Sequence, residues 1–312
     1  MSTITAPAPD TMPGCFTKDT LGPAAAGFYR ERGYLVVSDA LGPDKVDELV
    51  GETVRICRGE RGVFSPEGTR MDRPLRTDGM SDEEVQRQFL CIHHPHKMSA
   101  VMRRYLAEET VVKVLTSVVG PNVKCMQSML FIKSAGEPGQ AWHQDEDFIP
   151  TRDRSLVGAW IALDNATVEN GCLWIIPGSH KPGILWPMHP HTDKRFDCTH
   201  ESHRFPYGDN DAVPVEVPAG AVVFFNGYTL HRSLPNNAPG GFRRVLVNHY
   251  MSAESLLPWQ MKGDTPVAQL DYRDIVMVAG EDPYAWKGRE DLARAHVRPD
   301  GHGGCADGRE LR

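Results

Sequence analysis

The sequence lacks an apolar run of the roughly 18 residues that a membrane-spanning helix needs, so no membrane partner is expected. It also lacks an excess of basic residues, since 34 Lys and Arg stand against 41 Asp and Glu and the net charge is −7. Proteins that bind the phosphate backbone of nucleic acids normally carry a basic surface. A nucleic-acid partner is therefore not expected either, and a small-molecule partner is favoured.

Paired cysteines are missing as well. The seven cysteines are odd in number and scattered, and none forms a Cys-x-x-Cys pair. A disulfide framework and a structural zinc site are therefore disfavoured. The pattern is typical of reduced thiols in a cytoplasmic protein, and the N-terminus has no basic-then-apolar secretion signal.

Hydrophobic periodicity predicts mostly helix in the first third of the chain. Residues 42–54 begin with Gly-Pro-Asp and then place apolar residues at helical spacing. A capping box at Ser81 predicts a second helix that contains Val85, Phe89 and Ile92. Residues 108–119 have a third apolar stripe, which Gly-Pro at 120–121 ends.

After residue 121, short apolar runs separated by Gly, Pro and Asn are typical of antiparallel strands. We predict strands within residues 123–133, 156–163, 172–176, 213–217, 221–225 and 242–251. Helices followed by many short strands favour a mainly β fold with flanking helices, whose core is a double-stranded β-helix (jelly roll or cupin-like). We expect a single domain over residues 15–298, with the jelly-roll core at about 121–252 and mobile tails at 1–14 and 299–312.

Trp142-His143-Gln144-Asp145 is the most informative motif. It follows an apolar run, and residues two apart on a strand point to the same face. His231 lies in a later strand-like segment. Two imidazoles and a carboxylate form the facial triad that holds non-haem Fe(II) in oxygenases and leaves positions open for ligands. Glu146 should point away from this site, and Asp147 would reach it only if the strand continued.

Two adjacent arginines begin the last apolar run, and either could complete a co-substrate site. The planar fork of an arginine suits bidentate binding of a carboxylate. Arg243 and Arg244 are adjacent and would face opposite ways on a strand, so alternation alone does not decide between them.

The chain resembles the phytanoyl-CoA dioxygenase family of Fe(II)- and 2-oxoglutarate-dependent oxygenases. The resemblance extends from about Gly33 to Ser252. It is carried by Trp142-His-Gln-Asp145, by His231-Arg-Ser233 and above all by the run Glu169-Asn-Gly-Cys-Leu-Trp-Ile-Ile-Pro-Gly-Ser-His180. Segments 127–133, 158–160 and 241–243 also match the family's pattern.

The resemblance implies a role for each matching residue. His143, Asp145 and His231 would bind Fe(II), with 2-oxoglutarate and O2 as co-substrates. Arg243, which follows Gly-Phe as in the family, would bind the distal carboxylate of 2-oxoglutarate. The remaining co-substrate contacts would come from Ser233, Trp160, Met129 and Gln127.

The implied reaction is hydroxylation of an unactivated C–H bond in a small molecule, with release of succinate and CO2. Related halogenases lack the carboxylate that stands here as Asp145, so halogenation is disfavoured. Desaturation, ring formation and epoxidation stay open. One alternative is a cupin-like metal-dependent isomerase or a non-catalytic metal-binding jelly roll, which would not need Arg243. Another is an oxygenase that modifies a macromolecule, which the acidic charge weakens.

Three groups of residues have open interpretations. The six arginines between Arg55 and Arg76 either bind an acidic substrate or belong to a solvated loop. The cluster His93, His94 and His96 either lines the substrate pocket, binds a second metal or lies on the surface. The long segment 186–210, which contains four histidines, has the length of a lid or binding loop.

Overall fold

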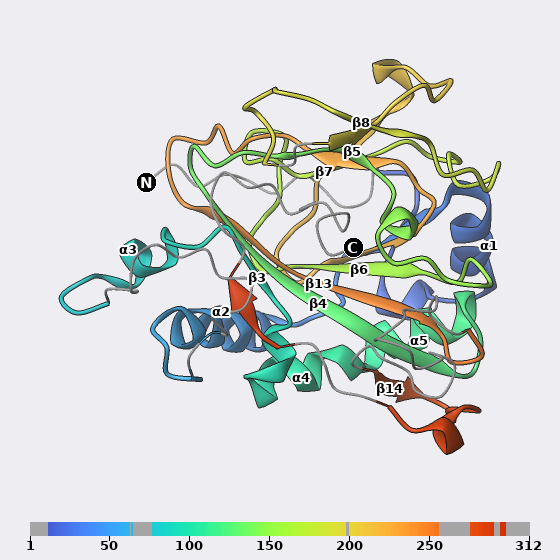
Figure 1. The fold of residues 1–312 in the computed structure, drawn as a ribbon, viewed down its shortest axis with the longest axis horizontal. Coiled ribbons are helices and arrows are strands. Elements are labelled where there is room, and N and C mark those ends of the chain that lie inside the picture. The colour runs from blue at the N-terminus through green and yellow to red at the C-terminus, as the bar shows by residue number, and fades with distance from the viewer. Residues whose placement is uncertain are drawn as a thin grey trace, which may run out of the picture.

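A computed structural model describes residues 12–62, 64, 77–197, 200–255, 275–289 and 294–297. Two β-sheets lie face to face, and the helices lie mainly on the outer side of the larger sheet (Figure 1). The main sheet has the strand order β1 (Cys15–Phe16), β2 (Tyr34–Val37), β11 (Val222–Asn226), β6 (Val157–Ala162), β13 (Phe242–Ser252), β4 (Val123–Ser134), β3 (Cys91–His93) and β15 (His296–Val297), with β14 (Val276–Ala279) also paired to β4.

The smaller sheet has the order β10 (Val213–Val215), β7 (Leu173–Ile175), β12 (His231–Ser233) and β5 (Gln140–His143). A separate pair is formed by β8 (Met188–Pro190) and β9 (His200–Ser202). The two facing sheets are the jelly roll that the strand pattern predicts. Gly139 allows β5 to begin directly against β12, because a Cβ there would lie 2.0 Å from the carbonyl oxygen of Ser233.

Alternation along the central strands separates two cores. Leu246 of β13 faces the helices, whereas Val245 and Val247 face the smaller sheet. The helices on the outer face are α1 (Pro23–Arg32), α2 (Pro43–Cys57), α3 (Asp82–Gln86), α4 (Ala100–Arg104) and α5 (Glu109–Val118). Leu49 of α2 and Leu115 of α5 are fully buried in that outer core. The helices therefore cover the outer face of the main sheet, and its inner face packs against the smaller sheet.

Most of the predicted elements are confirmed. All six predicted strands are present, and α2 and α5 match the first and third predicted helices. The capping box is also present, because Ser81 Oγ accepts from the Glu84 amide and the Glu84 carboxylate accepts from the Ser81 amide. No helix in the described part of the chain has the length and apolar composition needed to cross a bilayer.

One prediction for the first third is wrong, and another is incomplete. The second helix ends at Gln86 and does not reach Ile92, which lies in strand β3. The third of the chain predicted as mostly helical also contributes β1 and β2 to the main sheet. In both cases pairing to strands far along the chain, β4 and β11, overrides the local pattern. Most of the proposed tails, residues 1–11 and 299–312, lie outside the described residues.

Candidate metal centre

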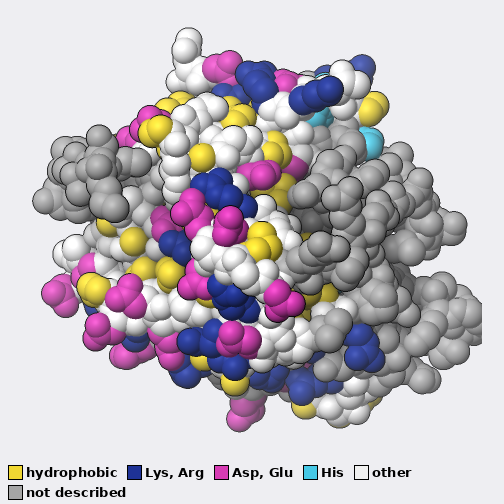
Figure 2. Space-filling model, turned by 90° about the vertical axis from the view of Figure 1, so that its left-hand side faces the viewer, with side chains coloured by type: hydrophobic (Ala, Val, Ile, Leu, Met, Phe, Trp, Pro, Cys, Tyr) yellow, Lys and Arg dark blue, Asp and Glu magenta, His cyan; other side chains and the backbone are white. Residues whose placement is uncertain are grey.

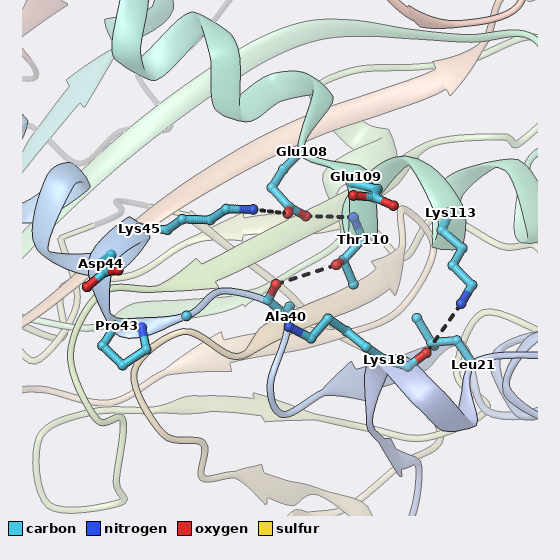
Figure 3. Close-up of a pocket in the computed structure, with 11 residues that line it drawn as sticks. Lys18, Leu21, Ala40, Pro43, Asp44, Lys45, Glu108, Glu109, Thr110 and Lys113 are labelled. Atoms are coloured by element: carbon cyan, nitrogen blue, oxygen red, sulfur yellow. Dashed lines mark hydrogen bonds and ion pairs between the residues drawn. The ribbon is translucent and has the colours of Figure 1, made fainter.

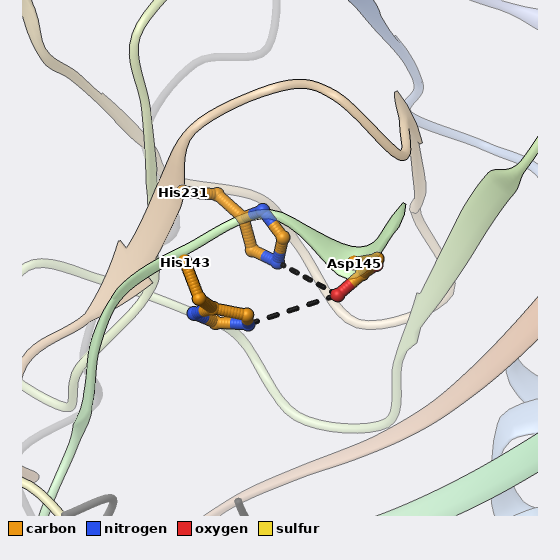
Figure 4. A group of neighbouring side chains, drawn as sticks. All are labelled: His143, Asp145 and His231. Atoms are coloured by element: carbon orange, nitrogen blue, oxygen red, sulfur yellow. Dashed lines mark ion pairs between the residues drawn. The ribbon is translucent and has the colours of Figure 1, made fainter. Parts of the chain in front are cut away.

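Three potential metal ligands meet where β5 and β12 pair. His143 ends β5, His231 begins β12, and the two are directly opposite in the antiparallel register. Asp145 Oδ1 lies 3.5 Å from His231 Nε2 and 3.7 Å from His143 Nε2 (Figure 4). The ligand atoms of all three residues lie within 4.8 Å of one another, and all three are buried. The residues that were predicted as iron ligands are therefore brought together.

Backbone hydrogen bonds fix the orientation of both imidazoles. Nδ1 of His143 donates to the carbonyl of Ala141 at 2.8 Å, and Nδ1 of His231 donates to the carbonyl of Thr229 at 2.9 Å. Each ring therefore presents Nε2 toward Asp145. Metal-binding histidines are oriented in this way, by a hydrogen bond from the nitrogen that does not bind the metal.

The pKa values of the three triad residues are shifted in different directions by their surroundings. Burial, together with the neighbouring His231, lowers the pKa of His143 to about 4, so this ring is neutral at pH 7. Burial opposes a charge on His231, but the Asp145 carboxylate outweighs it and raises the pKa of that ring. Burial also disfavours the Asp145 carboxylate, yet His231 and His249 hold its pKa well below the usual range. The site thus keeps an anionic oxygen beside two imidazoles, which is a donor set suited to Fe(II).

The strand prediction for the His-x-Asp motif is only partly right. β5 ends at His143, and Asp145 begins a 3-10 turn over Asp145–Asp147. Gln144 between them is extended, with φ −127° and ψ 126°, so His143 and Asp145 still face the same side. The Gln144 amide bonds on the other side to the carbonyls of Ile184 and Tyr228.

The two neighbouring carboxylates do not belong to the triad. Asp147 is exposed, because the strand does not continue to it. Glu146 accepts hydrogen bonds from the amide and hydroxyl of Thr151, both at 2.5 Å. Glu146 is therefore engaged elsewhere, as expected.

A cavity between the two sheets opens onto the triad, and we call it the triad cavity. Its lining comes from both sheets and consists of Met129, Phe131, Gln140, His143, Asp145, Trp160, Leu173, Phe225, His231, Ser233, Arg243, Val247 and His249. Of the residues that were predicted to contact the co-substrate, Met129, Trp160, Ser233 and Arg243 line the triad cavity. Gln127 lies on β4 two residues before Met129 and does not line the cavity.

The register of β13 distinguishes the two arginines. Arg243 lines the triad cavity and is 3% exposed. Arg244 faces the other way, where its guanidinium binds the Asp164 carboxylate at 2.6 and 2.8 Å and Gln86 at 3.1 Å. Of the two arginines, Arg243 is therefore the one that faces the cavity.

Lys133 is a buried basic residue that the sequence analysis did not select. It is opposite Arg243 in the β4–β13 register and is 2% exposed. Its Nζ donates to Ser233 Oγ at 3.1 Å and to the Leu234 carbonyl at 2.7 Å. Burial and the neighbouring Arg243 hold the pKa of Lys133 well below its ordinary value. Lys133 shares strand parity with Met129 and Phe131, and this signal could have identified it.

His249 is the second residue that was missed. It lines the triad cavity, is 4% exposed, and places Nε2 3.1 Å from Asp145 Oδ2. It follows Arg243, Val245 and Val247 at strand spacing, so the identification of Arg243 as inward-facing would have pointed to it.

The described arginines of the 55–76 segment have structural partners. The buried Glu52 carboxylate accepts from Arg55 at 2.8 Å, from Arg61 at 2.6 Å and from Ser99 at 2.6 Å. Arg58 is paired with Asp82. This part of the anion-binding hypothesis loses its support. Arg70, Arg73 and Arg76 lie outside the described residues.

The histidine clusters form no metal site among the described residues, where only the triad brings three ligand groups together. His93 stacks on His296 with ring centroids 4.8 Å apart. In the main sheet His93 is opposite Met129, so it lies on the inner face beside the triad cavity. In segment 186–210, His189 is paired with Glu201 across β8 and β9 at 3.0 Å.

A second pocket lies between the N-terminal ends of α2 and α5 (Figure 3). Lys45 binds Glu108 at 2.9 Å, the same carboxylate caps α5 through the Thr110 amide at 2.7 Å, and Lys113 donates to the Lys18 carbonyl at 3.3 Å. These polar groups hold the helix ends together. On the molecular face in Figure 2, the basic and acidic side chains of the described residues are intermixed, and these residues form no continuous basic surface.

Comparisons with known proteins agree with this geometry. The sequence profile described as phytanoyl-CoA dioxygenase (PhyH) matches residues 29–245. Phytanoyl-CoA dioxygenase 1 of Oryza sativa subsp. japonica is 34% identical over 252 residues, which cover 73% of this chain and 88% of that protein.

Solved structures share the fold at lower identity. A non-heme monooxygenase, ThoJ in its apo form, has a TM-score of 0.62 at 19% identity, covering 88% of this chain and 89% of that chain. The non-heme alpha ketoglutarate dependent carbocyclase SnoK from nogalamycin biosynthesis has a TM-score of 0.58 at 22% identity, covering 85% and 100%. The facing sheets are thus the jelly roll of these enzymes.

Proposed function

The chain belongs to the phytanoyl-CoA dioxygenase family, and from this we propose that it hydroxylates an unactivated C–H bond of a small-molecule metabolite. Fe(II) is the cofactor, and 2-oxoglutarate and O2 are the co-substrates. In balanced form, 2-oxoglutarate, O2 and R–H give succinate, CO2 and R–OH. One oxygen atom enters the new carboxylate of succinate, and the other enters the hydroxyl group.

The observation that carries the proposal is the position of Arg243 in the same cavity as the triad. Arg243 is buried, its Nε makes no hydrogen bond with any described residue, and no described carboxylate forms an ion pair with it. Burying an unpaired guanidinium is costly. A dianionic co-substrate would remove that cost, since one carboxylate could bind Arg243 while the 2-oxo acid end reached the triad.

Seven residues that line the cavity have a role in this proposal. His143, Asp145 and His231 would hold Fe(II), which supplies the redox chemistry that activates O2. Arg243 would bind the distal carboxylate of 2-oxoglutarate. Ser233 Oγ already accepts from Lys133 and from the Gln140 amide, at 3.1 and 3.2 Å, so its own proton is left to donate into the cavity. Met129 and Trp160 would exclude water around the co-substrate.

Gln127 is less well placed to contact 2-oxoglutarate than the other residues that match the family. It lies on the same face of β4 as Met129 but outside the cavity lining. We therefore propose for it at most a contact with the substrate, which would lie further out along this face.

The cupin-like isomerase alternative explains less. Such an enzyme would need the triad but would have no use for Arg243, or for Lys133 beside it. Hydroxylation is preferred over ring formation as the simplest outcome of oxidising a C–H bond. We propose that the substrate is a small molecule. The cysteine pattern of the chain favours the cytoplasm as the compartment of the protein.

Release of succinate tests the proposal. The purified chain with Fe(II), ascorbate and labelled 2-oxoglutarate should release succinate and CO2 slowly without substrate, and Arg243→Ala should not. A chain that neither binds 2-oxoglutarate by anaerobic calorimetry nor releases succinate is not such an oxygenase. With 18O2, one member of a panel of small acids should then be converted to a product with one labelled oxygen. A product without label that has lost two hydrogen atoms would replace hydroxylation by desaturation or ring formation.

A further inference from the structure

We propose that His249 is a positioning residue that keeps Asp145 a one-oxygen ligand of the metal. This inference rests on the proposed function, because it concerns the same metal centre. His249 is a buried side chain that lines the triad cavity and has no role yet in the proposed reaction.

The two oxygens of Asp145 have different surroundings. Oδ1 lies 3.5 Å from His231 Nε2 and 3.7 Å from His143 Nε2. Oδ2 lies 3.1 Å from His249 Nε2. Since an ionised carboxylate only accepts hydrogen bonds, Nε2–H of His249 is the donor. One oxygen therefore faces the two imidazoles, and the other is held by a hydrogen bond.

His249 does not have the geometry of a fourth ligand. In the described part of the chain, the one group of three or more ligand atoms that all lie within 4.8 Å of one another comes from His143, Asp145 and His231, and His249 is not part of it. The nitrogen of His249 that faces Asp145 is committed as a donor, and a donor cannot bind a metal at the same time. Its other nitrogen, Nδ1, is buried and makes no hydrogen bond with a described residue.

The hydrogen bond affects how many positions stay open at the metal. A carboxylate can bind a metal through one oxygen or through both. Three ligand atoms from the chain would leave open positions at the metal for the 2-oxo acid and for O2. A second oxygen from Asp145 would take one of these. By holding Oδ2 away, His249 keeps the position for O2 free, and it also fixes the carboxylate for metal binding.

The test uses full-length chain with Fe(II) under anaerobic conditions. His249→Phe keeps a flat ring of similar size but removes the donor, whereas His249→Gln restores an N–H near the same place. His96→Phe is the matched control, because His96 is also buried (3% exposed) and its hydrogen bond goes to Ser128. Thermal unfolding by circular dichroism checks that each variant folds. If His249→Phe does not fold, His249→Leu takes its place.

Two readouts do not depend on turnover. The first is the Fe(II) dissociation constant, which should rise about 10- to 100-fold in His249→Phe and stay within about threefold of wild type in His249→Gln and His96→Phe. The second is the binding of nitric oxide, as a substitute for O2, to the chain loaded with Fe(II) and 2-oxoglutarate, followed by electron paramagnetic resonance. Nitric oxide should bind His249→Phe more weakly than wild type or His249→Gln.

Several results would overturn the inference. Wild-type Fe(II) and nitric oxide binding in His249→Phe would show that Asp145 needs no help from His249. Equal losses in His249→Phe and His249→Gln would assign the effect to packing and not to the hydrogen bond. A wild-type chain that binds no Fe(II) would instead defeat the proposed function itself.

Discussion

The guanidinium carbon of Arg243 lies 5.5 Å from the centroid of the Trp160 ring, inside the triad cavity. The two residues come from neighbouring strands of the main sheet, β13 and β6. The indole face stabilises the cation, which has no carboxylate partner among the described residues. Burial lowers the pKa of Arg243 to about 10, and the side chain is still charged at pH 7. The cavity therefore offers a fixed positive charge to an anion.

Arg243→Ala should weaken 2-oxoglutarate binding about 30-fold or more. Removing one member of a buried, hydrogen-bonded charge pair costs about 2 kcal/mol or more. Calorimetry with Fe(II) in the absence of oxygen measures the effect. Arg244→Ala is the control, since Arg244 binds Asp164 outside the cavity and should affect stability only. Equal losses in the two variants would contradict the assignment of Arg243.

Lys133→Met and Ser233→Ala should each weaken 2-oxoglutarate binding, and their effects should not add. Lys133 donates to Ser233 Oγ, so both changes disturb the same hydroxyl. Double-mutant cycles of residues in one hydrogen-bond network give interaction energies of about 0.5–3 kcal/mol. Dissociation constants for the two single variants and the double variant complete the cycle. Fully additive losses would mean that the two residues act separately.

Metal binding should stabilise the fold. Fe(II) at about 100 times its dissociation constant should raise the free energy of unfolding by about 2.7 kcal/mol, because the folded chain brings the triad together. Denaturant unfolding with Fe(II), compared with a chelator, measures this increase. In Asp145→Ala the increase should largely disappear. An increase of the same size in that variant would place the metal elsewhere.

Glu52→Gln should destabilise the chain at neutral pH but not in strong acid. Burial alone would raise the pKa of Glu52, but hydrogen bonds from Arg61, Ser99 and Arg55 outweigh it and lower the pKa to about 2. A lowered pKa gives stability that is present above the unfolded-state value near 4.5 and is lost as the pH falls toward 2. The shift corresponds to at most about 3 kcal/mol.

Urea unfolding of wild type and Glu52→Gln between pH 7 and pH 2 tests this expectation. The difference in unfolding free energy should shrink steadily below about pH 4.5. Arg104 and Glu48 form an exposed pair that serves as the control, and Glu48→Gln should change stability by less than about 1 kcal/mol at any pH. If the difference in unfolding free energy stays constant over this pH range, the pKa of the Glu52 carboxylate is not lowered in the folded chain.

Six strands of the fold and the three residues of the triad could be predicted from the sequence, because both leave local signals in it. Strand alternation marks residues such as Leu246 and Val247, and His-x-Asp is a compact motif. The short strands β2 and β3 were missed, since their pairing depends on β11 and β4, which are far away in the chain. Four-residue and three-residue strands carry too little periodicity to be distinguished from helix.

The choice between Arg243 and Arg244 depended on the register, which a single sequence does not specify. Once the inward face of β13 is known, parity also identifies His249 on that strand. Lys133 follows in the same way, because it is opposite Arg243 on β4. These residues belong to no contiguous motif, so their roles emerge only when the strands are paired.

The direct pairing of His143 with His231 has a consequence for how such an enzyme can change its substrate. Both ligands are positioned by each other's strands and by their own backbone carbonyls. The segment between β7 and β10, residues 176–212, lies within the chain that connects them and supplies neither ligand. Insertions or deletions there could remodel the approach to the iron while the reaction centre kept its shape. Substrate choice and oxygen chemistry can therefore vary independently within one architecture.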